Sequence, residues 1–207
     1  MIVFLHFARR AALALAFAGL IAGAPAAAAT PAEVFVSGNI QKSLSILDDS
    51  HLTAAQRGEQ FRQFLLGVTD LKRVATFTLG SYGARASDTD KAAFAAAFQN
   101  YALAVYRSYF SKYAGQTLTV TGSTQHAADD AVVMTALTDP AEHGRTMEVD
   151  FRVRSNADAP TIVDFSVAGI WLAPEERDQF VAFLDRNNGS IPSLIAHLDE
   201  LRAKFGG

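Results

Sequence analysis

Histidines and acidic residues are the side chains that could do acid–base or metal chemistry in this chain, because the sequence contains no cysteine. The histidines after the N-terminal segment are His51, His126, His143 and His197. None has the H-x-x-x-H or H-E-x-x-H spacing that brings two ligands to one zinc ion. His143 and Asp150 are a candidate acid–base pair. We therefore expect no metal site and no cofactor.

Two pairs of adjacent acidic residues have structural explanations. Asp129 and Asp130 fall in a predicted turn, where carboxylates cap backbone amides. Glu175 and Glu176 fall in the first turn of a predicted helix, where the helix dipole favours acids. The chain has no G-x-S-x-G elbow, and the stretch GSYGARAS lacks the lysine and the preceding strand of a phosphate-binding loop.

The N-terminal segment has the order of charged, apolar and small residues that is typical of a secretory signal. Arg9 and Arg10 precede an apolar run over 11–22, and Pro25 and small residues follow. The run is short of the about 20 residues that span a membrane, although a retained anchor is the alternative. We therefore expect a signal peptide over 1–29 and a single domain over 30–207.

The charge balance argues against nucleic acid as a partner. Removal of the predicted signal takes away two arginines and no acid, which moves the formal net charge from −3 to −5. A mildly acidic chain without a Lys/Arg cluster binds nucleic acid poorly. Without cysteine there is no disulfide framework, so stability must come from the core.

The pattern along the chain predicts helices, then strands, then helices. Thr30 with Glu33, and Thr53 with Gln56, are capping-box signatures. Ser87 is a further predicted helix cap. Helices are predicted over 30–49, 53–68, 70–80, 88–113, 174–187 and 191–205, and strands over 117–125, 131–138, 145–155 and 161–171. This order predicts an α+β fold, in which a curved antiparallel sheet of about four strands is covered on one face by helices.

The predicted helix over 88–113 is apolar around most of its circumference. It carries no charge between Lys91 and Arg107, and its large side chains form two stripes instead of one. Both stripes could pack on protein, with the helix lying on the sheet, as aromatic stripes usually do. Alternatively, part of the space between the helix and the sheet is open as an apolar pocket. Periodicity does not separate the two.

Two motifs in the chain carry a family resemblance. The first covers 79–116, and the second is a strand Asp followed by a Gly and then by a helix with Arg-x-Gln-Phe. Their residues are Leu79, Gly80, Phe94, Phe98, Tyr101, Tyr106, Tyr113, Gly115 and Gln116, then Asp164, Gly169 and the stretch Arg177 to Phe180. With these residues in this order, the chain resembles the MlaC/toluene-tolerance family of periplasmic phospholipid-binding proteins.

The chain departs from the family pattern near the second motif. Residues 168–171 read Ala-Gly-Ile-Trp where the family commonly has Glu-Gly-Val-Ser, and Val163 replaces an aromatic residue. With these departures, the chain is similar to the hopanoid-associated members of the family, which are called HpnM. The lipid implied by the resemblance is therefore a phospholipid or a hopanoid.

The resemblance implies a monomeric periplasmic carrier that moves lipid between an outer-membrane lipoprotein complex and an inner-membrane ABC transporter complex. Such a carrier would help to maintain outer-membrane lipid organisation. The expected lipid-binding residues are Phe94, Phe98, Tyr101, Val105, Tyr106, Val149, Phe151, Phe165 and Val167. The alternatives are a small cavity-containing enzyme, a hopanoid-associated accessory protein and a purely structural partner. Because Asp150 and Asp164 are predicted on the outer sheet face, the apolar inner face favours a carrier over an enzyme.

Overall fold

The computed structural model describes residues 28–110, 113–142, 145–155 and 159–205. Residues 1–27 of the predicted signal peptide, and His143 of the acid–base hypothesis, lie outside the described residues. The described chain has the predicted α+β order. Its helices are α1 (Pro31–Asp48), α2 (Ala54–Val68), α3 (Leu71–Thr78), α4 (Ser81–Arg85), α5 (Asp88–Phe110), α6 (Leu172–Arg186) and α7 (Ile191–Lys204), with a short 3₁₀ helix at Pro140–Glu142.

The helix starts that the sequence predicts are confirmed. Thr30 Oγ1 accepts a hydrogen bond from the backbone N–H of Glu33 at 3.2 Å, and Glu33 Oε2 accepts one from the backbone N–H of Thr30 at 2.9 Å. Thr53 and Gln56 make the same reciprocal pair at the start of α2. At the start of α5, Ser87 Oγ accepts from the backbone N–H of Asp90 at 3.0 Å. These local bonds satisfy helix N–H groups that have no intrahelical partner.

The sheet is antiparallel throughout and follows chain order. Its strands are β1 (Thr117–Ala127), β2 (Asp130–Thr138), β3 (Thr146–Ser155), β4 (Pro160–Val167) and β5 (Ile170–Trp171). The predicted single strand over 161–171 is in fact a hairpin, because Ala168 and Gly169 both have positive φ angles, of 50° and 81°. A two-residue turn with positive φ at both positions reverses the chain tightly. The sheet therefore has a short fifth strand that the alternating pattern did not reveal.

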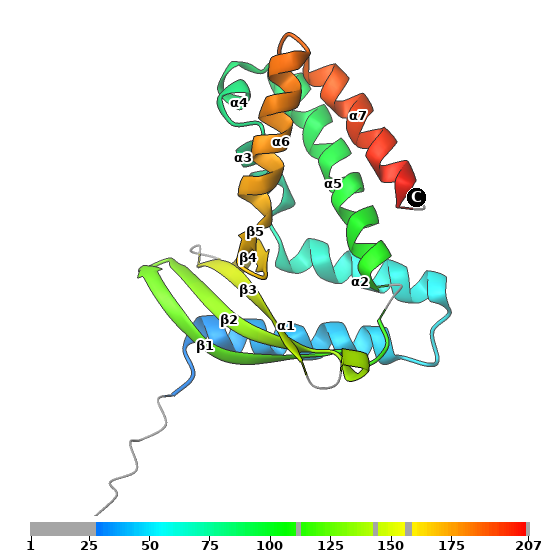
Figure 1. Ribbon diagram of the computed structural model, residues 1–207, viewed down its shortest axis with the longest axis vertical. Coiled ribbons are helices and arrows are strands. Elements are labelled where there is room, and N and C mark those ends of the chain that lie inside the picture. The colour runs from blue at the N-terminus through cyan, green and yellow to red at the C-terminus, as the bar shows by residue number, and fades with distance from the viewer. Residues whose placement is uncertain (1–27, 111–112, 143–144, 156–158, 206–207) are drawn as a thin grey trace, which may run out of the picture.

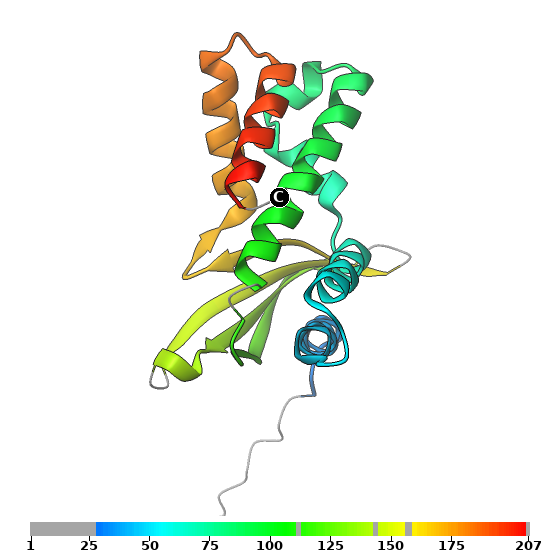
Figure 2. The same cartoon turned by 90° about the vertical axis from the view of Figure 1, so that its right-hand side faces the viewer.

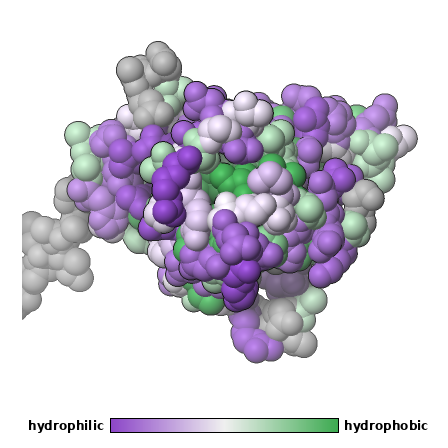
Figure 3. All heavy atoms as spheres, turned by 90° about the horizontal axis from the view of Figure 1, so that it is seen from above, coloured by the Kyte–Doolittle hydropathy of each residue, from purple (hydrophilic) through white to green (hydrophobic). Residues whose placement is uncertain are grey.

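The helices form two groups around the sheet. In Figures 1 and 2, α1 and α2 lie along the curved sheet, whereas α5, α6 and α7 stand away from it together with α3 and α4. We call this second group the helical lobe. The long helix α5 does not lie flat on the sheet as expected, and only its C-terminal end reaches the sheet. Figure 3 looks down on the lobe and shows hydrophobic residues near the centre of this face, surrounded by hydrophilic ones.

Three groups of buried apolar side chains correspond to this arrangement. The helical core consists of Leu71, Ala75, Leu79, Phe94, Ala97, Phe98, Ala102, Phe180, Leu184, Ile191, Leu194 and Leu198. The sheet core consists of Ala32, Val36, Ala131, Val133 and Val153. The α2 cluster consists of Phe61, Phe64 and Leu65. The helical lobe therefore has a core of its own, separate from the one between α1 and the sheet.

An ion-pair network joins β2 to β3. Asp130 is buried, and its carboxylate accepts from Arg152 Nε at 3.0 Å and from Arg152 Nη2 at 2.7 Å. Arg154 Nη1 donates to the same carboxylate at 3.1 Å. The hydrogen bonds from Arg152 are the main reason that the pKa of Asp130 is lowered to about 2. The turn between β1 and β2, where the sequence predicted a structural role for this acid, is thus tied to the neighbouring strand.

Asp130 should make the protein sensitive to acid over a defined pH range. A carboxyl group whose pKa is lowered by folding stabilises the folded state above its unfolded pKa of about 4. That contribution is lost as the pH falls from about 4 towards 2. We expect Asp130→Asn to lower the free energy of unfolding at neutral pH by about 1–3 kcal/mol, because hydrogen bonds to charged groups have this size. The stability of this variant should also fall less between pH 4 and pH 2 than that of the unmodified protein.

Urea unfolding at a series of pH values measures both effects. Asp178→Asn is the matched control, because Asp178 is exposed and makes no ion pair with any described residue. The assignment fails if Asp130→Asn and Asp178→Asn lose stability in parallel as the pH falls.

Candidate functional site

Three aromatic side chains connect the end of α5 to the sheet. The rings of Tyr106 on α5 and Phe165 on β4 have centroids 5.8 Å apart. Phe165 and Phe151 are directly opposite each other on β4 and β3, and their rings stack with centroids 6.4 Å apart. We call Tyr106, Phe165 and Phe151 the aromatic row. Its members come from three elements, so only the folded chain brings them together.

The aromatic row lies where the three groups of buried residues meet. Tyr106 packs against both the helical core and the α2 cluster, and Phe151 packs against the sheet core. All three rings are only partly buried, unlike the central residues of the helical core. The row therefore borders the separate cores without belonging fully to any of them.

Two valines extend the same sheet face beyond the aromatic row. Val149 pairs with Val167 two residues along from the pair of Phe151 and Phe165, and side chains two residues apart on a strand share a face. Thr135 of β2 is opposite Val149 and is buried, and its hydroxyl donates to the carbonyl oxygen of Val149. This polar group is satisfied internally, so the face remains apolar.

The first half of α5 has a different environment. Phe94 and Phe98 are 0% and 5% exposed, and both rings meet Phe180 of α6 edge-on, with centroids 6.1 and 6.3 Å apart. Tyr101 lies at the margin of this core, and Val105 is partly buried one turn further along. Of the nine expected lipid-binding residues, the structure brings Tyr106, Val149, Phe151, Phe165 and Val167 together, and it places Phe94 and Phe98 in the helical core.

Two carboxyl groups lie near the start of α6, and both make structural bonds. Asp164 Oδ1 accepts from the backbone N–H groups of Phe165 and Ala173, each at 2.9 Å. Burial raises the pKa of Asp164, and these two hydrogen bonds oppose the rise. Glu176 Oε1 accepts from the Tyr101 hydroxyl at 3.0 Å, and burial raises its pKa as well. Asp164 thus caps a helix nine residues away, which no local sequence signal indicates.

Asp150 is a third acid, which the sequence predicts on the outer sheet face. Its side chain lies on the opposite face of β3 from Phe151, as predicted, but this residue is buried and only 7% exposed. Its Oδ2 accepts from Ser166 Oγ on the neighbouring strand at 3.4 Å, and its Oδ1 is buried without a described partner. No group of three or more His, Asp or Glu residues within the described ranges has the geometry of a metal site.

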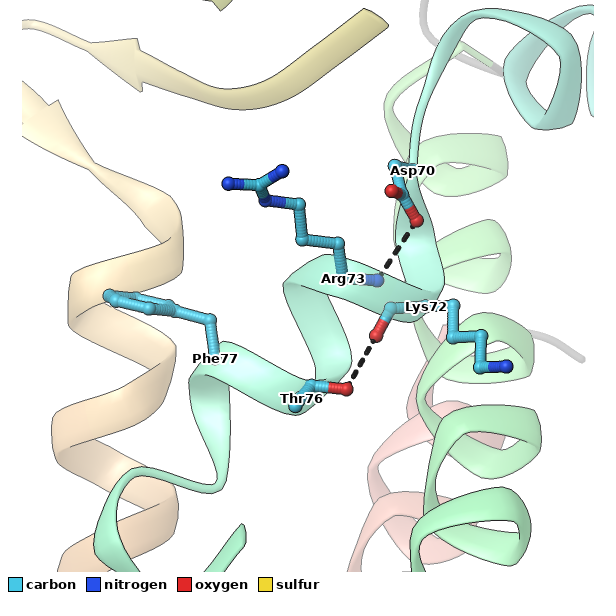
Figure 4. Close-up of a pocket in the computed structure, with 5 residues that line it drawn as sticks. All are labelled: Asp70, Lys72, Arg73, Thr76 and Phe77. Carbon is cyan, nitrogen blue, oxygen red and sulfur yellow. Dashed lines mark hydrogen bonds between the residues drawn. The ribbon is translucent and has the colours of Figure 1, made fainter. Parts of the chain in front are cut away.

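Two hollows lie elsewhere on the surface. One, of about 490 Å³, is lined by Asp70, Lys72, Arg73, Thr76 and Phe77 (Figure 4). The other, of about 510 Å³, lies between α4 and the loop that joins α6 to α7 and includes Tyr82 and Pro192. Neither hollow is lined by a residue of the aromatic row. Among the helices that the structure describes, none is both long and apolar enough to cross a membrane.

Comparison with known proteins identifies the fold and the family. The phospholipid-binding protein from Ralstonia solanacearum, solved in complex with a phospholipid, is similar with a TM-score of 0.75. The sequences are 19% identical, and the similarity covers 86% of this chain and 100% of that one, which shows a shared fold. No match is found among curated proteins. The family model described as MlaC protein matches residues 38–200, and the chain therefore belongs to the MlaC family.

Proposed function

We propose that this protein is a periplasmic carrier of phospholipid and that acyl chains bind along the aromatic row. The observation that carries the proposal is the position of the aromatic row between the three cores, together with membership of the MlaC family. Partly buried apolar rings lie between three separate cores, next to an apolar sheet face that ends in Val149 and Val167. The similar fold from Ralstonia solanacearum, which was solved with a phospholipid, supports the same ligand class.

The physical requirement for a lipid carrier matches this surface. Each CH₂ group removed from water contributes about 0.8 kcal/mol, so an acyl chain needs a long apolar surface and few directed contacts. The row supplies ring faces from α5, β4 and β3 in sequence, and the valine pair continues them. The lipid-binding residues that we propose are Val105, Tyr106, Val149, Phe151, Phe165 and Val167.

The acidic residues near the row do not favour the enzyme alternative. Asp164 and Phe165 are consecutive residues of β4, so the carboxyl group and the ring lie on opposite faces of the strand. Asp164 Oδ1 accepts from two backbone N–H groups, and Glu176 Oε1 accepts from the Tyr101 hydroxyl. Both groups therefore serve to hold α6 in place.

The route of transport extends the proposal beyond binding. Family membership supports delivery between an outer-membrane lipoprotein complex and an inner-membrane ABC transporter, which would help to maintain outer-membrane lipid organisation. At the turn between β4 and β5, Gly169 keeps the family residue, whereas Ala168, the exposed Ile170 and Trp171 differ from the usual family residues. A hopanoid in place of phospholipid is the second candidate cargo, and this departure is the feature that favours it.

The first test identifies the cargo. We expect protein purified from its native host to carry lipid at a low integer stoichiometry, because an apolar row exposed to water would be unfavourable. Native mass spectrometry measures the stoichiometry, and solvent extraction followed by lipid mass spectrometry distinguishes phospholipid from hopanoid. The proposal is contradicted if the purified protein is free of lipid and takes up neither phospholipid nor hopanoid from vesicles.

The second test compares two phenylalanine truncations. Phe98→Ala removes a ring from the helical core and should cost about 3–5 kcal/mol in lipid-free and lipid-loaded protein alike. Phe165→Ala removes the central ring of the aromatic row, so it should mainly reduce the extra stability that bound lipid provides. Thermal unfolding of delipidated and lipid-loaded samples of each variant measures both quantities.

The same pair of variants decides whether the row binds cargo. Phe98→Ala is the matched control, because it is the same chemical change at a position that contacts Phe180 instead of the sheet. If Phe165→Ala and the unmodified protein gain equal stability from lipid, the row is ordinary packing and does not contact the cargo.

A further inference from the structure

An aromatic ring stands exposed on the outer surface of the helical lobe. Phe77 of α3 is 43% exposed and lines the hollow of about 490 Å³. In Figure 4, the side chains of Phe77 and Arg73 both extend from α3 towards α6, and that of Lys72 extends to the other side of the helix. A large apolar side chain beside basic residues thus remains partly open to solvent.

Three basic residues lie on this part of α3 and α6. Lys72 and Arg73 line the hollow, and the guanidinium carbon of Arg177 lies 5.3 Å from the centroid of the Phe77 ring. None of these three cations forms an ion pair with any residue that the structure describes. Asp70 is the acid in the lining, and its Oδ1 accepts from the backbone N–H of Arg73. The hollow is therefore locally basic in a chain whose net charge is −3.

The backbone holds this surface in place. Gly80, which lies between Leu79 at the end of α3 and the start of α4, has φ of +54°, and a Cβ atom at this position would lie 2.9 Å from Val181 Cγ2 and 3.3 Å from Arg177 Nε. Only glycine permits this close approach of the α3–α4 turn to α6. The approach keeps Arg177 beside Phe77, so the ring and the cation form one preorganised surface.

The surface is also connected to the strand that carries Phe165. The backbone N–H of Asp70 donates to the carbonyl oxygen of Ile162 on β4 at 3.4 Å, and Thr69 forms a bridge with the same residue. The hollow consequently opens beside the junction of the helical lobe and the sheet (Figure 4). Ile162 lies three residues before Phe165 on β4, so one strand links the hollow to the aromatic row.

We propose that Lys72, Arg73, Phe77 and Arg177 form a docking surface for a membrane that bears anionic phospholipid head groups. The guanidinium groups of Arg73 and Arg177 can donate hydrogen bonds to phosphodiester groups. The exposed ring of Phe77 can insert at the boundary between head groups and acyl chains. Each basic residue near an anionic bilayer strengthens adsorption by about fivefold, so three of them give weak and reversible adsorption. A protein that must leave the membrane again requires contact of this strength. The docking surface is separate from the aromatic row, so the two proposals can fail independently.

Vesicle flotation with the chain over 30–207 tests the docking surface. The vesicles are phosphatidylcholine alone, and phosphatidylcholine mixed with phosphatidylglycerol. We expect binding to the anionic vesicles only, and we expect added salt to weaken it. The double variant Arg73→Gln/Arg177→Gln should lower the vesicle association constant by about tenfold or more. Phe77→Ser should weaken association while leaving its salt dependence unchanged.

Two controls make the outcome specific. Arg186→Gln/Lys204→Gln removes the same charge from exposed positions at the ends of α6 and α7 and should bind the anionic vesicles as the unmodified protein does. Phe165→Ala should also dock normally, because it alters cargo binding, and this result separates docking from cargo uptake. Thermal unfolding of each variant shows that it is folded.

The proposal is overturned if both double variants lose equal affinity, or if binding is the same on neutral and anionic vesicles. It is also overturned if the unmodified protein does not bind the anionic vesicles at all. In that case, an acidic protein surface would be the partner of these cations.

Discussion

The packing of Phe94 and Phe98 against Phe180 is the interaction on which the rest of the structure depends. These rings join α5 to α6 inside a core that also includes Leu194 and Leu198 of α7. Because this core buries the apolar face of the first half of α5, the helical lobe does not need the sheet to cover it. The lobe can therefore stand away from the sheet, as Figure 1 shows, and only the end of α5 reaches the inner face.

Strand β4 is the element that connects the two parts. Asp164 accepts hydrogen bonds from the start of α6, and Ile162 accepts one from Asp70 before α3. Phe165, whose side chain points to the other face of the strand, contacts Tyr106. Alternation along the strand thus places the Asp164 carboxylate and the Phe165 ring on opposite faces.

Local features of the fold could be predicted from the sequence, because short-range chemistry determines them. The capping boxes at Thr30 and Thr53 and the alternation along β3 depend on residues three or two positions apart. The environment of Phe98 could not be predicted in this way, since helical periodicity shows that a face is buried and does not show what buries it. The cap made by Asp164 was missed because its partner lies nine residues away, beyond a hairpin that the apolar pattern conceals.

The arrangement of the buried acids bears on what the site can recognise. Asp150 and Asp164 occupy strand positions that alternate with Phe151 and Phe165, and each carboxylate already accepts bonds from within the protein. The aromatic row consequently offers ring faces and aliphatic groups but no free acid on the same face. Such a surface distinguishes ligands mainly by apolar length and shape, because the Tyr106 hydroxyl is the one polar side-chain group among the three rings of the row. Any discrimination between lipid head groups must then come from polar residues outside the row, such as those that meet at the junction of α3, α6 and β4.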